Sequence, residues 1–287
     1  MSRIEQALEK AVKMREARKE VVHEESGVSG GQVALHKFEV GKAVINPAAV
    51  DRHVVCITEP RSLATEQYKK LRARIFRATT KDIHNTIMVT SSDVDEGKSL
   101  TAINLAVALS GEFDYTVLLV DADLRNPSIH KYLGIEQRKG LSNYLKGEVP
   151  LSDVLVKTGI GKLVLLPSGD SQENGTELLS SERMKMLVHE LKSRYKDRYI
   201  IFDSSPLLVT ADPISLGGFM DSVLFVIQEG RTSQKAVMQA LSLSKGWNIL
   251  GAVFNNVPEN LIKNRYSHYY RRGYQSDGRS EGIVKNA

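Results

Sequence analysis

Short apolar runs alternate with helical patterns through the middle of the chain. The runs cover residues 87–90, 117–120, 163–166, 199–202, 223–227 and 252–254. Brief continuous runs of this kind are typical of strands that are buried on both faces of a parallel sheet. Helical patterns lie between them, for example at residues 100–109 and 181–194. This alternation predicts a doubly wound, mostly parallel α/β sheet with helices on both faces, in a domain that spans residues 51–260.

A further helix is predicted over residues 62–78, ahead of the first strand. Ala64, Tyr68, Leu71 and Ile75 recur at helical spacing and form its apolar stripe. The charged side chains of this helix project mostly away from the stripe, among them Glu66, Lys69 and Arg72.

Residues 1–50 form a separate N-terminal segment in this scheme. Apolar residues at helical spacing, with Glu9 four positions before Lys13, predict an amphipathic helix over residues 1–20. A stretch rich in Gly, Ser and Glu follows at residues 24–32 and resembles a linker. Two interpretations stay open for this segment, a frayed terminus and a helix that docks on a partner.

Residues 261–287 have a different character from the preceding domain. They hold four of the ten tyrosines of the chain, with lysine and arginine between them and glycines that interrupt regular structure. The pattern predicts a flexible basic tail. Three roles are open for it: phosphorylation, contact with single-stranded nucleic acid, and no role. The tyrosines are Tyr266, Tyr269, Tyr270 and Tyr274.

Composition narrows the class of protein. The 287 residues carry 39 Lys+Arg against 34 Asp+Glu, a net charge of +5, which is too weak to argue for nucleic-acid binding by the domain. The one cysteine, Cys56, excludes a disulfide framework and favours a reducing compartment. The sequence shows neither a run of about 20 apolar residues nor an apolar leader. We therefore expect a soluble cytoplasmic protein.

A phosphate-binding loop is predicted directly after the first strand. Residues 91–99 read Ser-Ser-Asp-Val-Asp-Glu-Gly-Lys-Ser and lead into the helical pattern. Gly97 permits a tight turn beneath a phosphate, and backbone N–H groups at the helix start point at the anion. Lys98 would neutralise the β- and γ-phosphates, and the hydroxyl of Ser99 would bind Mg²⁺. Asp95 is unusual here, because an acid beside phosphates is unfavourable unless it points outward.

Three carboxylates follow two other predicted strands. Asp121 and Asp123 are two positions apart on an extended segment, so they point to the same side. Asp203 closes the apolar run at residues 199–202, as in a Walker B motif. At the carboxyl ends of parallel strands these groups would face the ligand crevice and serve Mg²⁺ and the transferred phosphate.

Together, these motifs resemble the bacterial tyrosine kinases of the P-loop type, the BY-kinases, over about residues 55–275. The likeness is greatest to cytoplasmic autokinases of exopolysaccharide operons, including the exosortase-associated group. It rests on the loop, on the segment Asp-x-Asp-x-Arg that ends at Arg125, on the Asp203 strand and on the tyrosine cluster. The family also has a Glu-x-x-Arg-x-x-Arg helix motif for ring assembly, matched by Glu66, Lys69 and Arg72 with Lys in place of the first Arg. Its usual Pro-Gly before Glu-Gly-Lys is Val94-Asp95 in this chain.

The resemblance implies a role for each matching residue. Lys98 and Ser99 would bind phosphate and Mg²⁺, Asp121 and Asp203 would share the metal, and Asp123 would accept the tyrosine proton. Further nucleotide contacts are expected from Asp95, Glu96, Gly97, Leu100 and Arg125. Asn255 has two open interpretations, a contact with the adenine and a turn before Pro258.

The resemblance also implies an ATP- and Mg²⁺-dependent tyrosine autokinase that regulates exopolysaccharide synthesis, chain length or export. Its tail would dock in the site of a neighbouring copy within a ring, and a membrane-spanning chain-length regulator would recruit it to the inner membrane. Two alternatives remain. One is a switch ATPase of the partitioning kind, although Asp93 stands where that class usually has a lysine. The other is a nucleotide-sensing scaffold of an envelope complex.

Overall fold

The computed structural model describes residues 41–42, 45–79, 85–112, 114–194 and 197–261. The N-terminal helix and the tyrosine-rich tail that the sequence predicts lie outside these residues. Eight strands occur in the described part: β1 (Gly41–Lys42), β2 (Thr86–Ser91), β3 (Thr116–Asp121), β4 (Val156–Lys157), β5 (Leu163–Leu166), β6 (Arg198–Asp203), β7 (Ser222–Gln228) and β8 (Ile249–Asn255).

The helices connect these strands along the chain. A short 3₁₀ helix, Pro47–Ala49, lies between β1 and the first of the α-helices. The α-helices are α2 (Val55–Thr58), α3 (Leu63–Thr79), α4 (Lys98–Ser110), α5 (Ile129–Tyr132), α6 (Leu141–Leu145), α7 (Leu151–Val154), α8 (Gly175–Leu179), α9 (Glu182–Arg194), α10 (Asp212–Gly217) and α11 (Gln234–Leu243).

The strands form one sheet in the order β1-β4-β5-β3-β6-β2-β7-β8. Among the described strands every neighbouring pair is parallel except β4 with β5. β6 lies between β2 and β3, so the carboxyl ends of these three strands meet at one edge of the sheet. The register places Asp121 opposite Asp203 on adjacent strands. The predicted α/β sheet is confirmed, and its topology brings the phosphate loop beside both carboxylate segments.

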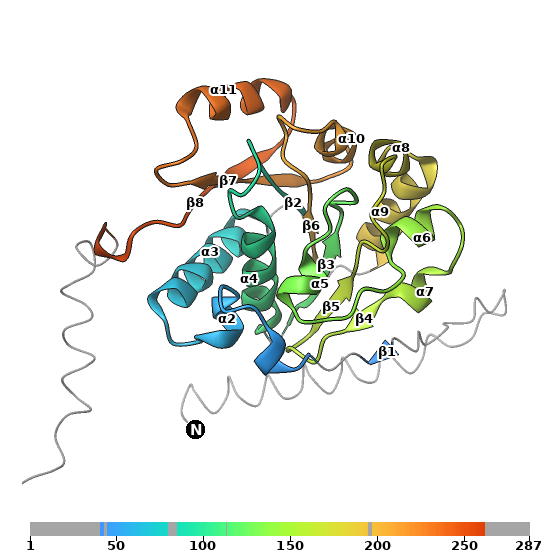
Figure 1. The fold of residues 1–287 in the computed structure, drawn as a ribbon, viewed down its shortest axis with the longest axis horizontal. Helices are drawn as coiled ribbons and strands as arrows, with labels where there is room; N and C mark the ends of the chain where they lie inside the picture. Colours follow the sequence, from blue (N-terminus) through green and yellow to red (C-terminus); the bar gives the residue numbers. More distant parts are fainter. Residues whose placement is uncertain (1–40, 43–44, 80–84, 113, 195–196, 262–287) are drawn as a thin grey trace, which may run out of the picture. The chain divides into compact units, whose positions relative to one another are not determined.

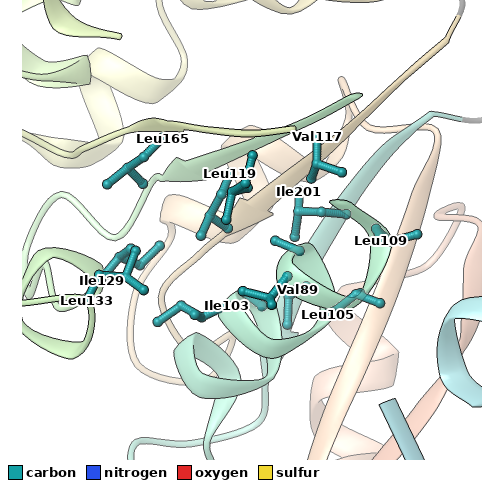
Figure 2. Close-up of a cluster of buried hydrophobic side chains, with 14 of the residues drawn as sticks. Val89, Ile103, Leu105, Leu109, Val117, Leu119, Ile129, Leu133, Leu165 and Ile201 are labelled. Carbon is teal, nitrogen blue, oxygen red and sulfur yellow. The ribbon is translucent and has the colours of Figure 1, made fainter. Parts of the chain in front are cut away.

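Helices cover both faces of the sheet (Figure 1). On one side α4 packs against the central strands with α3 against α4, and on the other lie α6, α8 and α9. The core beneath α4 is drawn in Figure 2, where Ile103, Leu105 and Leu109 meet Val89 of β2 and Ile201 of β6. All five side chains are fully buried, and burial of each contributes about 1.5–3 kcal/mol. This packing fixes α4, and with it the loop that leads into the helix.

The edges of the sheet differ from expectation. The prediction that every strand is buried on both faces is wrong for β8, because it is an edge strand in which Ala252 and Phe254 are exposed. β1 and β4 carry no apolar run long enough to predict them. Residues 41–50, assigned to the N-terminal segment from the sequence, contribute to the folded unit: β1 pairs with β4, and Ile45 and Val50 are buried in the core.

Across the described ranges, none of the helices has the length and apolar character needed to cross a bilayer.

Candidate functional site

The loop between β2 and α4 has the shape that phosphate binding requires. Gly97 adopts φ = +85° directly before α4, a conformation that L side chains rarely adopt. A Cβ at this position would lie 1.9 Å from Nδ2 of Asn255. Glycine is therefore needed both for the turn and for the close approach of Asn255. The turn leaves the first backbone N–H groups of a 13-residue helix facing the crevice, where an anion is stabilised.

One lysine and three carboxylates converge at the carboxyl ends of β2, β3 and β6. Nζ of Lys98 lies 3.4 Å from Oδ2 of Asp123, and both side chains are largely buried. Asp121 and Asp203 are fully buried at paired positions of the sheet. Ser99 follows Lys98 in the first turn of α4 and is also buried. The structure thus brings together five of the residues that the sequence predicted for this site.

Burial and mutual repulsion shift the titration of these acids. Burial raises the pKa of Asp203 to about 7; Lys98 and the nearby Ser99 hydroxyl oppose this rise, and Asp123 adds to it. Burial likewise raises the pKa of Asp121 well above its usual value, and the charges of Asp203 and Asp123 add to the rise. Burial alone would lower the pKa of Lys98, but Asp203, Asp123 and Asp121 outweigh it and raise that pKa. A further cation at this point would stabilise the ionised forms of Asp121 and Asp203.

The carboxylates fit a magnesium ion. Neither oxygen of Asp203 has a hydrogen-bond partner among the described residues, and the same holds for Oδ1 of Asp121. Buried acceptors without partners are rare and costly, so a ligand that uses them is expected. Within the described ranges no three His, Cys, Asp or Glu side chains are arranged to hold a metal by themselves. Magnesium needs no such cage, because one or two carboxylates, water and nucleotide phosphates complete its coordination.

A cavity of about 740 Å³ opens above the loop. Its volume suits a small-molecule ligand. Lys98, Ser99 and Asp123 lie in its wall, together with Asp95, Gly97, Leu100 and Arg125 from the predicted nucleotide contacts. The segment after β3 supplies the opposite wall, including His130 and Tyr132. Seven predicted residues therefore face one shared space.

Three predicted nucleotide contacts have other partners in the structure. Glu96 and Asn255 are absent from the described cavity wall; Nδ2 of Asn255 donates to the backbone oxygen of Glu96 at 3.1 Å. The side chain of Asn255 thus supports the loop, and Asn256 after it has φ = +57°, as in a turn at the end of a strand. A contact of Asn255 with the adenine stays a prediction. Arg125 lines the cavity, but its Nε donates to buried Asp212 at 3.0 Å and its guanidinium also donates to Thr176. Arg125 thereby holds α8 and α10 beside the site.

Asp95 borders the cavity, but its carboxylate is exposed to solvent and lies near a cation. The side chain is 79% exposed, and its nearest cation is the guanidinium of Arg231 at 3.7 Å. Its backbone has φ = +58°, where the usual glycine of the family would sit without strain. The loop therefore keeps its turn, with the acid in solvent.

The predicted assembly residues make contacts within the chain. Nζ of Lys69 lies 2.6 Å from Glu66 on the surface of α3. Arg72 donates to the backbone oxygen of Ala108, near the end of α4, and pairs with Glu112 at 2.8 Å. Arg72 is thus partly engaged in joining α3 to the phosphate-loop helix.

Sequence reasoning missed Thr232, Arg231, Thr176 and Asp212. The hydroxyl of Thr232 donates to Glu96, and that of Thr176 donates to Asp212. Both bonds join segments far apart in the sequence, and the segments around Thr232, Thr176 and Asp212 carry no motif. Only the position of Asp212, at the N-terminus of a short helix with Pro213, left a local signal, and that signal predicts a helix start.

Known proteins with similar sequences and folds have related activities. The family model described as AAA domain matches residues 84–246. Tyrosine-protein kinase YwqD of Bacillus subtilis is 36% identical over 224 residues, which cover 77% of this chain and 92% of that protein. The solved kinase domain of Escherichia coli tyrosine kinase ETK superposes with a TM-score of 0.67 at 26% identity, covering 82% of this chain and 84% of that one. A ParA family ATPase from Chlorobium tepidum, at 22% identity and a TM-score of 0.50 over 63% of this chain and 78% of that one, shares the fold alone.

Proposed function

Because the chain belongs to the family of bacterial tyrosine-protein kinases, we propose that it transfers the γ-phosphate of ATP to tyrosine side chains, its own C-terminal tyrosines included. The observation that carries this proposal is the convergence of Lys98 with Asp121, Asp123 and Asp203 behind a phosphate loop. A lysine and metal-binding carboxylates beside a phosphate loop suit phosphoryl transfer, because that reaction depends mainly on positioning the reacting groups and on neutralising the phosphate charge.

Each group has a distinct task in the transfer. Lys98 would contact the β- and γ-phosphates, and its raised pKa keeps it charged. Ser99, Asp121 and Asp203 would hold magnesium, which when bound neutralises phosphate charge. Asp123 would accept the phenol proton, because a tyrosine of pKa about 10 is a poor nucleophile until that proton leaves. The phenol oxygen then bonds to the γ-phosphorus as the bond to the bridging oxygen breaks, and ADP leaves.

Asp123 is well placed for that task. One of its oxygens accepts the backbone N–H of Asn126 at 3.1 Å, which fixes the carboxylate, and the other faces Lys98. It also lines the cavity, whereas Asp121 and Asp203 lie behind the described wall. Of the three acids, Asp123 is therefore the one that an incoming tyrosine would meet.

The acceptors we propose are Tyr266, Tyr269, Tyr270 and Tyr274, in the tail of a neighbouring copy within a ring. The tail carries Lys263, Arg265, Arg271 and Arg272, and each phosphate adds about −1.5 to −2 charge, so modification would turn it acidic. A docked tail that acquires this charge would leave the acidic site. Glu66, Lys69 and Arg72 on α3 are the proposed assembly surface.

We propose exopolysaccharide synthesis or export as the process, with a membrane-spanning chain-length regulator as activator at the inner membrane. Support comes from the family resemblance and from the absence of a membrane-crossing helix among the described residues. A switch ATPase has less support, because its likeness to this chain is limited to the fold and Asp93 replaces its signature lysine.

Mixing two chains, neither of which can phosphorylate its own tail, tests transfer between copies. One chain has all four tail tyrosines replaced by Phe and keeps Lys98; the other carries Lys98→Met and keeps its tyrosines. With ATP and Mg²⁺, we expect phosphotyrosine on the tail of the Lys98→Met chain, identified by its peptide masses. The control is a chain that combines both changes, mixed with Lys98→Met, which should give none. Phosphotyrosine in the unchanged chain, with none in the mixture, would contradict transfer between copies.

A further inference from the structure

Glu96 is a buried residue of the phosphate loop that directly follows three exposed ones. It is 2% exposed, whereas its neighbours Asp93, Val94 and Asp95 are all exposed. One carboxylate oxygen accepts the backbone N–H of Ser92 at 2.8 Å and that of Asp93 at 3.1 Å. The side chain therefore turns back into the protein and binds the first half of its own loop.

The second carboxylate oxygen of Glu96 binds a distant segment. It accepts a hydrogen bond from the hydroxyl of Thr232, 136 residues further along the chain. The same hydroxyl oxygen accepts the backbone N–H of Gln228, the last residue of β7, at 2.9 Å. Thr232 directly precedes Ser233, the N-cap of α11. One hydroxyl thus joins the phosphate loop to the connection between β7 and α11.

Two further contacts tie the same loop to the same side of the sheet. Arg231 donates to the backbone oxygen of Asp95 at 3.4 Å, and Asn255 at the end of β8 donates to that of Glu96. These contacts give two backbone oxygens of the loop donors within the protein, so neither oxygen need face the crevice. The N–H groups that begin α4 then remain directed at it, and those groups bind phosphate.

We propose that Glu96 is a positioning residue, held by Thr232, which makes the nucleotide affinity of the phosphate loop depend on the β7–α11 connection. Glu96 would contact no atom of the nucleotide. Its effect is on the shape of the loop, which binds phosphate equally in the ground state and in the transition state. Loss of such contacts raises KM and leaves kcat unchanged. The proposal rests on the proposed function only in that the loop binds a nucleotide.

The test measures ADP affinity with a fluorescent ADP analogue, alongside the unfolding midpoint without nucleotide. Glu96→Ala removes all three bonds of the carboxylate. Thr232→Val keeps the shape of the side chain and removes one of these bonds, together with the bond that the Thr232 hydroxyl accepts from Gln228. We expect the Kd for ADP to rise about tenfold in Glu96→Ala and about threefold in Thr232→Val, as for hydrogen bonds to a charged group. The KM for ATP should rise by the same factors, with kcat within about twofold.

Two matched variants serve as controls. Glu96→Gln can accept from the same two backbone N–H groups and donate to Thr232, and Thr232→Ser keeps the hydroxyl. Both should bind ADP within about twofold of the unchanged protein. In the double variant Glu96→Ala with Thr232→Val, the second change should add nothing to the loss of ADP affinity, because the bond between Thr232 and Glu96 is already gone.

Several outcomes would overturn the proposal. A lower unfolding midpoint with an unchanged Kd would show a purely structural role, and additive effects in the double variant would show that the two residues act separately. Should Glu96→Ala fail to fold, Thr232→Val against Thr232→Ser decides, since neither alters the loop itself. ADP binding needs no kinase activity, so a protein that shows these affinity changes and makes no phosphotyrosine would count against the proposed function alone.

Discussion

Replacement of Lys98 by methionine is expected to lower tyrosine phosphorylation at least about 10³-fold, the scale on which a cation facing the transferred phosphate acts. Lys98 faces Asp123 at 3.4 Å within a group of three buried carboxylates. Methionine fills similar space but leaves those acids without their cation. Phosphate oxygens would then meet net negative charge. The initial rate of phosphotyrosine formation at saturating ATP is the quantity to measure.

Lys131→Met is the matched control. Lys131 also lines the cavity, but it is exposed on α5, outside the carboxylate group. Charge in solvent is screened, so we expect its loss to change the rate by less than about threefold. Equal effects of the two changes would contradict a specific role for Lys98. A chain with Lys98→Met that keeps more than about a tenth of the original rate would contradict it as well.

Asp203→Asn is expected to move stability and function in opposite directions. Burial raises the pKa of Asp203 to about 7, so the charged form is costly in the folded protein without nucleotide. Asparagine removes that charge at nearly constant shape. We expect an unfolding midpoint about 5 °C higher at pH 8, together with a loss of Mg²⁺-dependent phosphorylation of at least about 10²-fold. Thermal unfolding and the initial rate are measured on the same preparation.

The pH dependence gives the sign of this effect. A carboxyl whose folded pKa lies above its unfolded value of 3.8 binds its proton more tightly in the folded state. Its contribution to stability is therefore complete below about pH 4 and is lost as the pH rises through about 7. The loss is at most about 4 kcal/mol, since one pKa unit corresponds to about 1.4 kcal/mol. In the unchanged protein the free energy of unfolding should therefore fall between pH 4 and pH 8, and in Asp203→Asn this part of the fall should be absent.

Asp221→Asn provides a control of opposite sign. Burial would raise the pKa of Asp221, but hydrogen bonds from Lys192 and Thr86 outweigh it and lower that pKa. Loss of the Asp221 charge should therefore destabilise the protein, with nucleotide binding unchanged. If Asp203→Asn also lowered the unfolding midpoint at pH 8, it would contradict the claim that the buried charge of Asp203 destabilises the protein when no metal is bound.

The central site could be predicted because its signals are local in the sequence. The loop at residues 91–99 lies between a strand and a helix, and each carboxylate follows an apolar run. Parallel topology then requires these segments to meet, and the register of β3 with β6 shows Asp121 beside Asp203. The α/β fold followed from the same alternation, since strands buried on both faces are continuously apolar.

The hydrogen bonds that hold the phosphate loop in place could not be predicted in this way. Thr232 and Glu96 are 136 residues apart, and Asn255 lies 159 residues from its acceptor. Single polar residues in loops give no periodic signal, so only the folded chain shows these pairs. β8 was misjudged for a related reason: its apolar run resembles a buried strand, but its place at the sheet edge exposes Phe254.

One measurement tests the central claim most directly. The purified chain is incubated with ATP and Mg²⁺, alone and with the cytoplasmic segment of a candidate membrane partner, and its phosphorylated residues are mapped by mass spectrometry beside Lys98→Met. We predict phosphate on Tyr266, Tyr269, Tyr270 and Tyr274 in the unchanged chain and none in the variant. ATP hydrolysis without phosphotyrosine in both conditions would contradict the tyrosine-kinase account and favour a nucleotide switch.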